Sequence, residues 1–361
     1  ALVVCGADLA SFSKTTWTLL TWHKEIVFAH TTPEQKLLIV KEFQKRKHVV
    51  AVTGDGVNDS PALKQANVGV AMGSGSEVAK EAADIVLVDA KFSSIVRGIY
   101  YGRLVFENLR KVVLYLLPAG SFSELMPILT NIFLGLPLPL SSFLMIVICA
   151  GTDALPSLSM IYEAAESKLM EKKPRSLTKE KLVNIQLLLH AYFFIGMMES
   201  VTAFGMYFYY MSVYGHLNVG DLFLCFDCYD GLFPGDPDQQ TSTANDTLYT
   251  AQTVFFVTLV VLQVCGNLLS TRTRRSSIFQ QLPFRGKTKN NHLFVFGALS
   301  IALAVQIVYL PLFNDVFNTR PIPVQFWFIP IGVGLLILLA DELRKVVARS
   351  LPLSVVRYIC W

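Results

Sequence analysis

The sequence predicts a parallel α/β domain in residues 1–110, followed by an all-α membrane domain of six transmembrane helices in residues 111–361. The pattern of apolar runs separates the two parts. Before Lys111 short apolar runs alternate with charged, helix-like stretches, and after it long apolar runs recur to the end. Composition agrees, because a chain that is 53% hydrophobic and 16% charged is too apolar for an ordinary soluble protein and too charged to lie wholly in lipid.

The first part is predicted to be a parallel sheet because its apolar runs are short and its connections are long enough to be helices. The runs are "EIVFA", "HVVAV", "NVGVAM" and "DIVLV", and the connections include "TPEQKLLIVKEFQKR" and "SEVAKEAA". Buried strands at helical spacing are typical of parallel α/β domains. We expect residues 49–52 to form a buried strand that leads into the loop "TGDGVND".

That loop is the first candidate site. Asp55 and Asp59 lie among glycines at the carboxyl end of the expected strand, where open α/β sheets bind ligands, with Asn58 beside them. Two carboxylates in a tight loop suit octahedral Mg²⁺, which leaves room for a phosphate. Lys36, early in a helix after Pro33, can reach a phosphate as a point charge. The alternatives are an aspartate-rich turn without a metal and an ordinary surface lysine.

The second part contains six apolar stretches, each close to the roughly 20 residues that cross about 30 Å of hydrocarbon. They predict helices near residues 112–134, 138–160, 185–212, 249–270, 291–313 and 324–343. An even number of spans places both chain ends on the same side of the membrane.

Charge indicates which side that is. The connections 161–184 and 271–290 are rich in Lys and Arg, whereas 213–248 has neither but has six aspartates. Because positively charged loops stay in the cytoplasm, we expect both chain ends there and 213–248 on the lumenal or exterior face.

The acidic connection carries two features that depend on this orientation. Asn245 begins the sequon Asn-Asp-Thr, which predicts a glycosylation site or an unused sequon. Cys225 and Cys228 are close enough in sequence for a bridge, but so short a loop is often strained, and we do not predict one.

Ionisable side chains inside membrane spans are costly and therefore indicate function. Glu124 lies in "PAGSFSELMP" and Asp153 in "CAGTDALP" of the next span, each beside helix-breaking Gly and Pro residues. Freed backbone carbonyls beside two carboxylates predict a cation site of the kind that transporters build near the membrane midplane. A structural hydrogen-bonded pair is the alternative.

Other polar residues in the spans are less specific. Gln263 and Asn267, four apart on the fourth span, are candidate neutral ligands of the cation, but polar contacts between helices explain them almost as well. We expect His190 and Glu199 of the third span to be solvated or interfacial.

Four stretches of the first part, "TPEQK", "TGDGVNDSPAL", "VGVAMG" and "AADIVL", together resemble the end of the phosphorylation domain of P-type ATPases, which has the haloacid-dehalogenase-like fold. In that family ATP phosphorylates the aspartate of a D-K-T-G-T motif and water removes the phosphate, with Mg²⁺ bridging the groups. The resemblance implies that Asp55 and Asp59 bind Mg²⁺, that Asn58 and Asp59 support catalysis, and that Lys36 binds the phosphate. Neither D-K-T-G-T nor the actuator motif T-G-E-S occurs here. We therefore expect a fragment whose nucleophile lies upstream and which does not hydrolyse ATP alone.

Five further stretches, "GRLVFENLRKV", "LPLPL", "GTDALPSLSMIYEAAES", "RTRRSSIFQQ" and "DELRKVVAR", narrow the resemblance to α subunits of the sodium/potassium and proton/potassium pumps. This implies an integral plasma-membrane protein in contact with lipid, with Na⁺, K⁺ or H⁺ as transported ions. Mg²⁺ would be the cofactor, ATP the substrate of the complete protein, and a β-like subunit a candidate partner; no nucleic acid is expected. We predict the carboxyl-terminal part of an ATP-driven monovalent cation pump, most simply of the Na⁺/K⁺-exchanging type.

The chain departs from that pattern at the expected ion site. Cys149 stands where an aspartate is expected, four residues before Asp153, and Ser121 and Ser123 replace an asparagine and a proline near Glu124. The ninth-helix glutamate of sodium pumps is absent from "FGALSIALAV". Losing a carboxylate removes charge and a hard oxygen that Na⁺ or K⁺ needs. A pump-like regulator or assembly partner that does not transport is therefore the alternative function.

Overall fold

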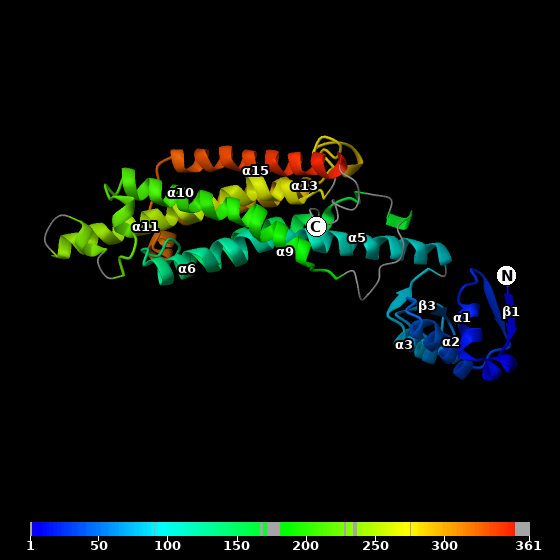
Figure 1. The fold of residues 1–361 in the computed structure, drawn as a ribbon. Helices are drawn as coiled ribbons and strands as arrows, with labels where there is room; N and C mark the ends of the chain where they lie inside the picture. Colours follow the sequence, from blue (N-terminus) through cyan, green and yellow to red (C-terminus); the bar gives the residue numbers. More distant parts are fainter. Residues whose placement is uncertain are drawn as a thin grey trace. The chain divides into compact units, whose positions relative to one another are not determined.

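The structure, a computed structural model, describes residues 2–89, 91–166, 169–171, 181–226, 229–233, 237–274 and 276–350. The chain divides into two compact units, the first ending at Gly102 and the second beginning at Arg103. The first is a small α/β unit, and the second is made of long helices (Figure 1).

All strand pairs of the first unit, within its described residues, are parallel. β1 (Leu2–Cys5) pairs with β2 (Ile26–Ala29), and a second sheet has the order β3 (Ala51–Gly54), β4 (Val68–Met72), β5 (Ile85–Leu87). The helices between the strands are η1 (Gly6–Ser11), α1 (Lys14–Leu20), α2 (Pro33–Lys45), η2 (Val57–Asp59), α3 (Ser60–Gln65) and α4 (Glu77–Ala82). The parallel α/β class predicted from the sequence is confirmed.

The strand expected at residues 49–52 is displaced and less buried than predicted. β3 begins at Ala51, and Val49 is exposed. β3 is less buried because it lies at the edge of its sheet, whereas the buried residues belong to β4, the central strand. Asn67 marks the start of β3, since its side-chain oxygen accepts the Val50 N–H at 2.9 Å.

Helix α2 positions Lys36, and its first turn is held by a capping box. Thr32 accepts the Gln35 N–H at 3.3 Å, and the Gln35 side chain accepts the Thr32 N–H at 2.9 Å. Pro33 begins the helix, where a missing N–H leaves no bond unmade. The Gln35 amide also donates to the Gly6 carbonyl at 3.0 Å, which ties the start of α2 to the end of β1.

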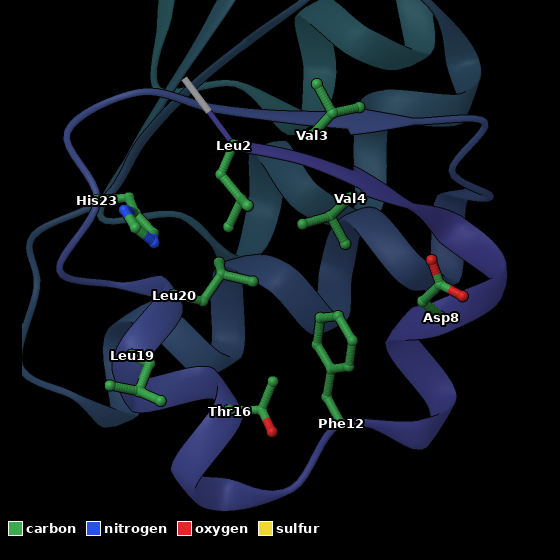
Figure 2. Close-up of a pocket in the computed structure, with 9 residues that line it drawn as sticks. All are labelled: Leu2, Val3, Val4, Asp8, Phe12, Thr16, Leu19, Leu20 and His23. Carbon is green, nitrogen blue, oxygen red and sulfur yellow. The ribbon is translucent and has the colours of Figure 1, made fainter.

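The core beneath β1 is apolar and lies beside a pocket. Val4, Leu9, Trp17 and Leu20 are buried together. Figure 2 shows the pocket, whose lining comes from β1, η1, α1 and the residues next to α1: Leu2, Val3, Val4, Asp8, Phe12, Thr16, Leu19, Leu20 and His23. None of these side chains belongs to the predicted phosphate chemistry, so this pocket is not the candidate site.

The second unit contains, among its described residues, six helical segments long and apolar enough to cross a membrane. The first three are α5 (Phe92–Leu117) with η3 (Pro118–Ser123) and α6 (Glu124–Leu134); α7 (Ser142–Val147) with η4 (Ile148–Thr152), α8 (Ala154–Ser159) and η5 (Met160–Tyr162); and α9 (Ile185–Leu189) with η7 (His190–Gly196) and α10 (Met197–Val213). The last three are α11 (Pro237–Leu262) with η10 (Gln263–Asn267) and α12 (Leu268–Thr271); α13 (Asn291–Tyr309); and α15 (Gln325–Ser350). Shorter helices are η6 (Leu169–Glu171), η8 (Val219–Leu222), η9 (Asp230–Leu232), η11 (Gly286–Thr288) and α14 (Pro311–Phe317).

Helix α11 is the centre of this unit. Its apolar side chains are the largest group in one buried cluster, to which α7, α10, α13 and α15 also contribute. Figure 1 shows α10, α11 and α15 running alongside one another, and residue contacts join α11 to both neighbours. A helix apolar on all sides is expected at such a central place.

The helix bounds differ from the predicted ones where polar residues continue a helix beyond its apolar run. The first span begins at Phe92 rather than near residue 112, and the last continues to Ser350. The fifth ends at Tyr309, because Pro311 begins a separate short helix. The apolar run in the sequence marks the part of a helix that crosses the membrane, but it does not reveal where polar residues continue the same helix.

Four of the described spans contain a π-helical turn: η3, η4, η7 and η10. Each turn includes a glycine, at Gly120, Gly151, Gly196 and Gly266. Glycine favours a helix less than any residue except proline, and π-turns are rare and frequently lie at functional sites. The polar residues predicted to bind a cation in the spans lie within these turns or one residue beyond them.

Candidate functional site

The loop after β3 brings Lys36 and Asp59 together. The Lys36 ammonium lies 2.6 Å from the Asp59 carboxylate, and this ion pair is partly accessible to solvent. Gly54 allows Asp59 to fold back over the strand, because a Cβ at that position would lie only 2.5 Å from the Asp59 Cβ. The sequence-predicted lysine and one predicted carboxylate thus form a single polar group at the carboxyl end of β3.

Asp55 occupies the exposed side of the same loop. A hydrogen bond fixes its backbone, since the Asp55 carbonyl accepts the Ser76 N–H at 2.8 Å. Gly75 makes room for this contact, as a Cβ there would lie 2.8 Å from the Asp55 carbonyl oxygen. The side chains of Asp55 and Asn58 are exposed. A fixed backbone with a free carboxylate suits a ligand that arrives from solution.

The donor set fits Mg²⁺ better than a transition metal. Among the described residues there is no group of three or more His, Cys, Asp or Glu side chains that could hold a metal ion. Mg²⁺ does not need such a group, because it binds through one or two carboxylates and fills its other positions with water and phosphate. Asp55 and Asp59 are the residues that could hold it.

In the second unit the structure brings Glu124 and Cys149 into contact. The Cys149 Sγ lies 3.2 and 3.4 Å from the two carboxylate oxygens of Glu124, and 3.7 Å from the Gly120 carbonyl oxygen. Glu124 is mostly enclosed, whereas Cys149 is exposed on the surface of the described chain. The residue that departs from the family pattern therefore faces the predicted ligand directly.

Asp153 lies one residue beyond η4 and is buried, with 1% of its surface exposed. Neither of its carboxylate oxygens has a hydrogen-bond partner among the described residues. A Cβ on Gly120 would lie 3.4 Å from one of these oxygens, so the first and second spans approach closely here. The alternative of a hydrogen-bonded structural pair with Glu124 does not agree with these open oxygens.

Gln263 and Asn267 are both buried at the two ends of η10. The Asn267 amide donates to the Tyr115 carbonyl at 3.1 Å, which joins the fourth span to the first. Its oxygen and the whole amide of Gln263 have no partner among the described residues. Asn267 thus makes the contact between helices and still offers an oxygen.

The expectation that His190 and Glu199 are solvated or interfacial is wrong. Glu199 has no exposed surface, and His190 is buried with its Nε2 3.9 Å from the Asp341 carboxylate of the last span. The reason is that η7 and α10 pack between the first and last spans, which periodicity in the third span alone does not reveal. A usable signal was present: Gly196 precedes Glu199 as Gly120 precedes Glu124. Tyr115, a buried hydroxyl beside the carboxylates, was also missed.

The features predicted for the acidic connection lie elsewhere or outside the described residues. Asn245 is in α11 and half-buried, not in a loop, because that helix already begins at Pro237. Cys225 is disulfide-bonded, and Cys228 lies outside the described residues.

A buried ion-pair network holds the polar ends of several spans. Arg272 Nε donates to both carboxylate oxygens of Glu163 at 2.8 and 2.9 Å, and the Asn290 amide donates to Glu163 at 2.8 Å. Lys111 on α5 pairs with Glu166 at 3.2 Å. These contacts join the first span to the segments that follow the second and fourth spans.

Comparison with known proteins identifies the family. Residues 137–347 match the family described as cation transporting ATPase, C-terminus, and residues 35–99 match haloacid dehalogenase-like hydrolase. The chain is 41% identical over 360 residues to the human sodium/potassium-transporting ATPase subunit alpha-4, covering 98% of this chain and 34% of the human protein. It is 40% identical over 363 residues to subunit alpha-2 of Rattus norvegicus, with coverage of 98% and 34%.

A third relative belongs to a different pump. Identity to the potassium-transporting ATPase alpha chain 2 of Oryctolagus cuniculus is 41% over 359 residues, covering 98% of this chain and 32% of the rabbit protein. The chain thus spans about a third of the length of the curated relatives it matches. With the family match across more than half of its residues, the chain belongs to the cation-transporting P-type ATPases, as the carboxyl-terminal part of a sodium/potassium- or proton/potassium-type α subunit.

Proposed function

We propose that this chain is the carboxyl-terminal part of an ATP-driven monovalent cation pump of the Na⁺/K⁺-exchanging type. Residues 1–110 would form the carboxyl-terminal part of the phosphorylation domain, and residues 111–361 would form the transmembrane domain through which the cation passes. One observation carries the proposal: a loop that pairs Lys36 with Asp59 occurs in the same chain as carboxylates buried at π-helical turns of apolar helices.

At the phosphate end each residue has a distinct role. Asp55 holds Mg²⁺ through its exposed carboxylate, and Asp59 provides a second oxygen near the ion. Lys36 binds the phosphate, and its 2.6 Å contact with Asp59 keeps the ammonium in place before the phosphate arrives. Asn58 is an exposed polar group of the same loop. Mg²⁺ supplies charge neutralisation between phosphate oxygens and carboxylates when bound. In the complete protein an upstream aspartate would attack the terminal phosphate of ATP, with ADP as the leaving group, and water would later release the phosphate from that aspartate.

In the membrane, Glu124 and Asp153 are the proposed charged ligands of Na⁺, K⁺ or H⁺. Gln263 and the open oxygen of Asn267 would serve as neutral ligands. Cys149 contacts Glu124 at the position where an aspartate would have added a negative charge. The site should therefore bind alkali cations more weakly than a site with an aspartate there.

The remaining assignments follow from charge and from the relatives. The basic connections support a cytoplasmic location for both ends of this chain, in an integral, lipid-embedded protein for which we propose the plasma membrane. A β-like subunit would dock on the opposite face, where a glycan on Asn245 would also lie. Because Asn245 is half-buried in a helix, we expect little glycosylation there.

The second candidate function is a pump-like protein that no longer transports and instead regulates or assembles with another. It is favoured by one observation, the thiol of Cys149 in contact with the Glu124 carboxylate.

An assay of the complete polypeptide in membranes separates the two candidates. ATP hydrolysis is measured while Na⁺, K⁺ and pH are varied separately, with Asp55→Asn as the inactive reference. A pump shows hydrolysis that depends on at least one of these ions. Hydrolysis absent under every condition, in a well-folded protein, favours the regulator.

A further inference from the structure

A third carboxylate lies within the membrane cluster. Glu199, on α10 of the third span, has 0% of its surface exposed, and neither carboxylate oxygen has a hydrogen-bond partner among the described residues. It interacts electrostatically with Asp153 on the second span. The hydroxyl of Tyr115, on the first span, interacts with both carboxylates. The first span meets the other two here, because Gly120 approaches an Asp153 oxygen while Ser123 bonds to Gly196 and Ser200 of the third span. The three side chains therefore share one interior region between three spans.

Tight packing holds Glu199 at this place. The Ser200 hydroxyl donates to the Ser123 hydroxyl at 3.0 Å, and Ser123 donates to the Gly196 carbonyl at 3.4 Å. Gly196 permits the approach, since a Cβ there would lie 3.0 Å from the facing aromatic ring. The third span is thus bound to the first next to Glu199, and the partner serine directly precedes Glu124 on the first span.

The charge of these groups requires a partner. A buried carboxylate without hydrogen bonds or a counter-ion is costly, and two close together also repel each other. Neither Asp153 nor Glu199 has a partner for its carboxylate oxygens among the described residues. A dehydrated cation between them would remove both costs, because two carboxylates and a hydroxyl are hard oxygen ligands. One proton on each carboxylate would also remove the charge, and the rubidium measurement below distinguishes a bound cation from bound protons.

We propose that Glu199 is a ligand of the transported alkali-metal cation, shared with Asp153 and the Tyr115 hydroxyl. The third span thereby supplies the negative charge that Cys149 does not supply on the second. This inference rests on the proposed function and adds one residue to the same site.

The test measures equilibrium binding of radioactive rubidium to the purified complete polypeptide, which needs no ATP hydrolysis. Glu199→Gln removes charge with little change of shape and should weaken rubidium binding by about tenfold or more. Adding Cys149→Asp to that variant returns a carboxylate to the site and should recover much of the affinity. Asp315→Asn, an acid-to-amide change at an exposed position of α14, is the matched control and should bind as the unmodified protein does.

The thermal midpoint, measured with and without rubidium, shows whether each variant is folded, because a bound ion raises it. If Glu199→Gln is too unstable to purify, Glu199→Asp keeps the charge at a shorter reach and should give an intermediate affinity. Unchanged rubidium affinity in Glu199→Gln, with Asp153→Asn impaired, overturns the role of Glu199 but leaves the pump intact. Absence of rubidium binding in the unmodified protein overturns the proposed pump function and this inference together.

Discussion

The buried pair of Arg272 and Glu163 provides a prediction about stability whose size follows from the structure. Arg272 is fully buried, and its Nε donates to both carboxylate oxygens of Glu163. Its Nη2 donates to the Thr288 carbonyl at 2.8 Å, and its Nη1 donates to the Gln281 carbonyl. Removing one partner of a buried pair leaves an uncompensated charge and typically costs about 3–5 kcal/mol. Glu163→Gln leaves the guanidinium without a balancing charge, and Arg272→Met leaves the carboxylate with only the Asn290 amide as a partner among the described residues.

For a unit of this size each single change should lower the thermal midpoint by on the order of 10 °C. The double variant Glu163→Gln/Arg272→Met removes both charges at once, so its loss should fall below the sum of the single losses by at least about 2 kcal/mol. The assay is thermal unfolding of the complete polypeptide in detergent, followed by fluorescence-detected size exclusion.

The exposed pair of Arg320 and Asp246 is the matched control. Its charges are 3.1 Å apart, but the two side chains are 37% and 62% exposed. Asp246→Asn should therefore cost less than about 1 kcal/mol. Equal midpoints for the buried and exposed variants, or strictly additive losses in the buried double variant, would refute the reasoning.

Three further predictions concern chemistry and topology. Asp55→Asn in the complete protein should abolish phosphoenzyme formation from ATP while leaving the thermal midpoint unchanged; a normal phosphoenzyme level contradicts the Mg²⁺ assignment. An impermeant thiol label should reach a cysteine placed at exposed Gly220 from the exoplasmic side but not one at exposed Gly286, and reversed labelling would overturn the orientation. Cys149→Asp should raise the apparent affinity for Na⁺ or K⁺, and Asp153→Asn should lower it, in ion-stimulated hydrolysis; indifference to both would place the cation elsewhere.

The fold class could be predicted because its signals are local. Apolar runs of membrane length and short runs at helical spacing need no knowledge of neighbouring elements. The same holds for Lys36 and Asp59, whose motifs predict one site and which do meet at 2.6 Å. The strand at β3 was misplaced because burial depends on which strand is central in the sheet, and that is a property of pairing rather than of residues 49–52 alone.

The buried carboxylates of the membrane spans were only partly predicted, for a related reason. Glu124 and Asp153 stand beside prolines and glycines that mark them in the sequence. Glu199 has only Gly196 nearby, and its burial depends on the packing of the third span against the first. A sequence pattern predicts the length and the polar positions of a single helix. Which of its carboxylates are buried, and what they contact, depends on how the other helices pack against it.

The proposed pump function requires that a cation bound between the membrane spans controls phosphate chemistry at the Asp55 loop. The most direct measurement is phosphoenzyme formation from ATP by the complete polypeptide, as Na⁺, K⁺ and pH are varied, with and without Asp153→Asn. The account predicts a phosphoenzyme level that depends on cation concentration, and a shift of that dependence to higher concentration in the variant. A phosphoenzyme that forms equally well at every cation concentration, in both proteins, would contradict it.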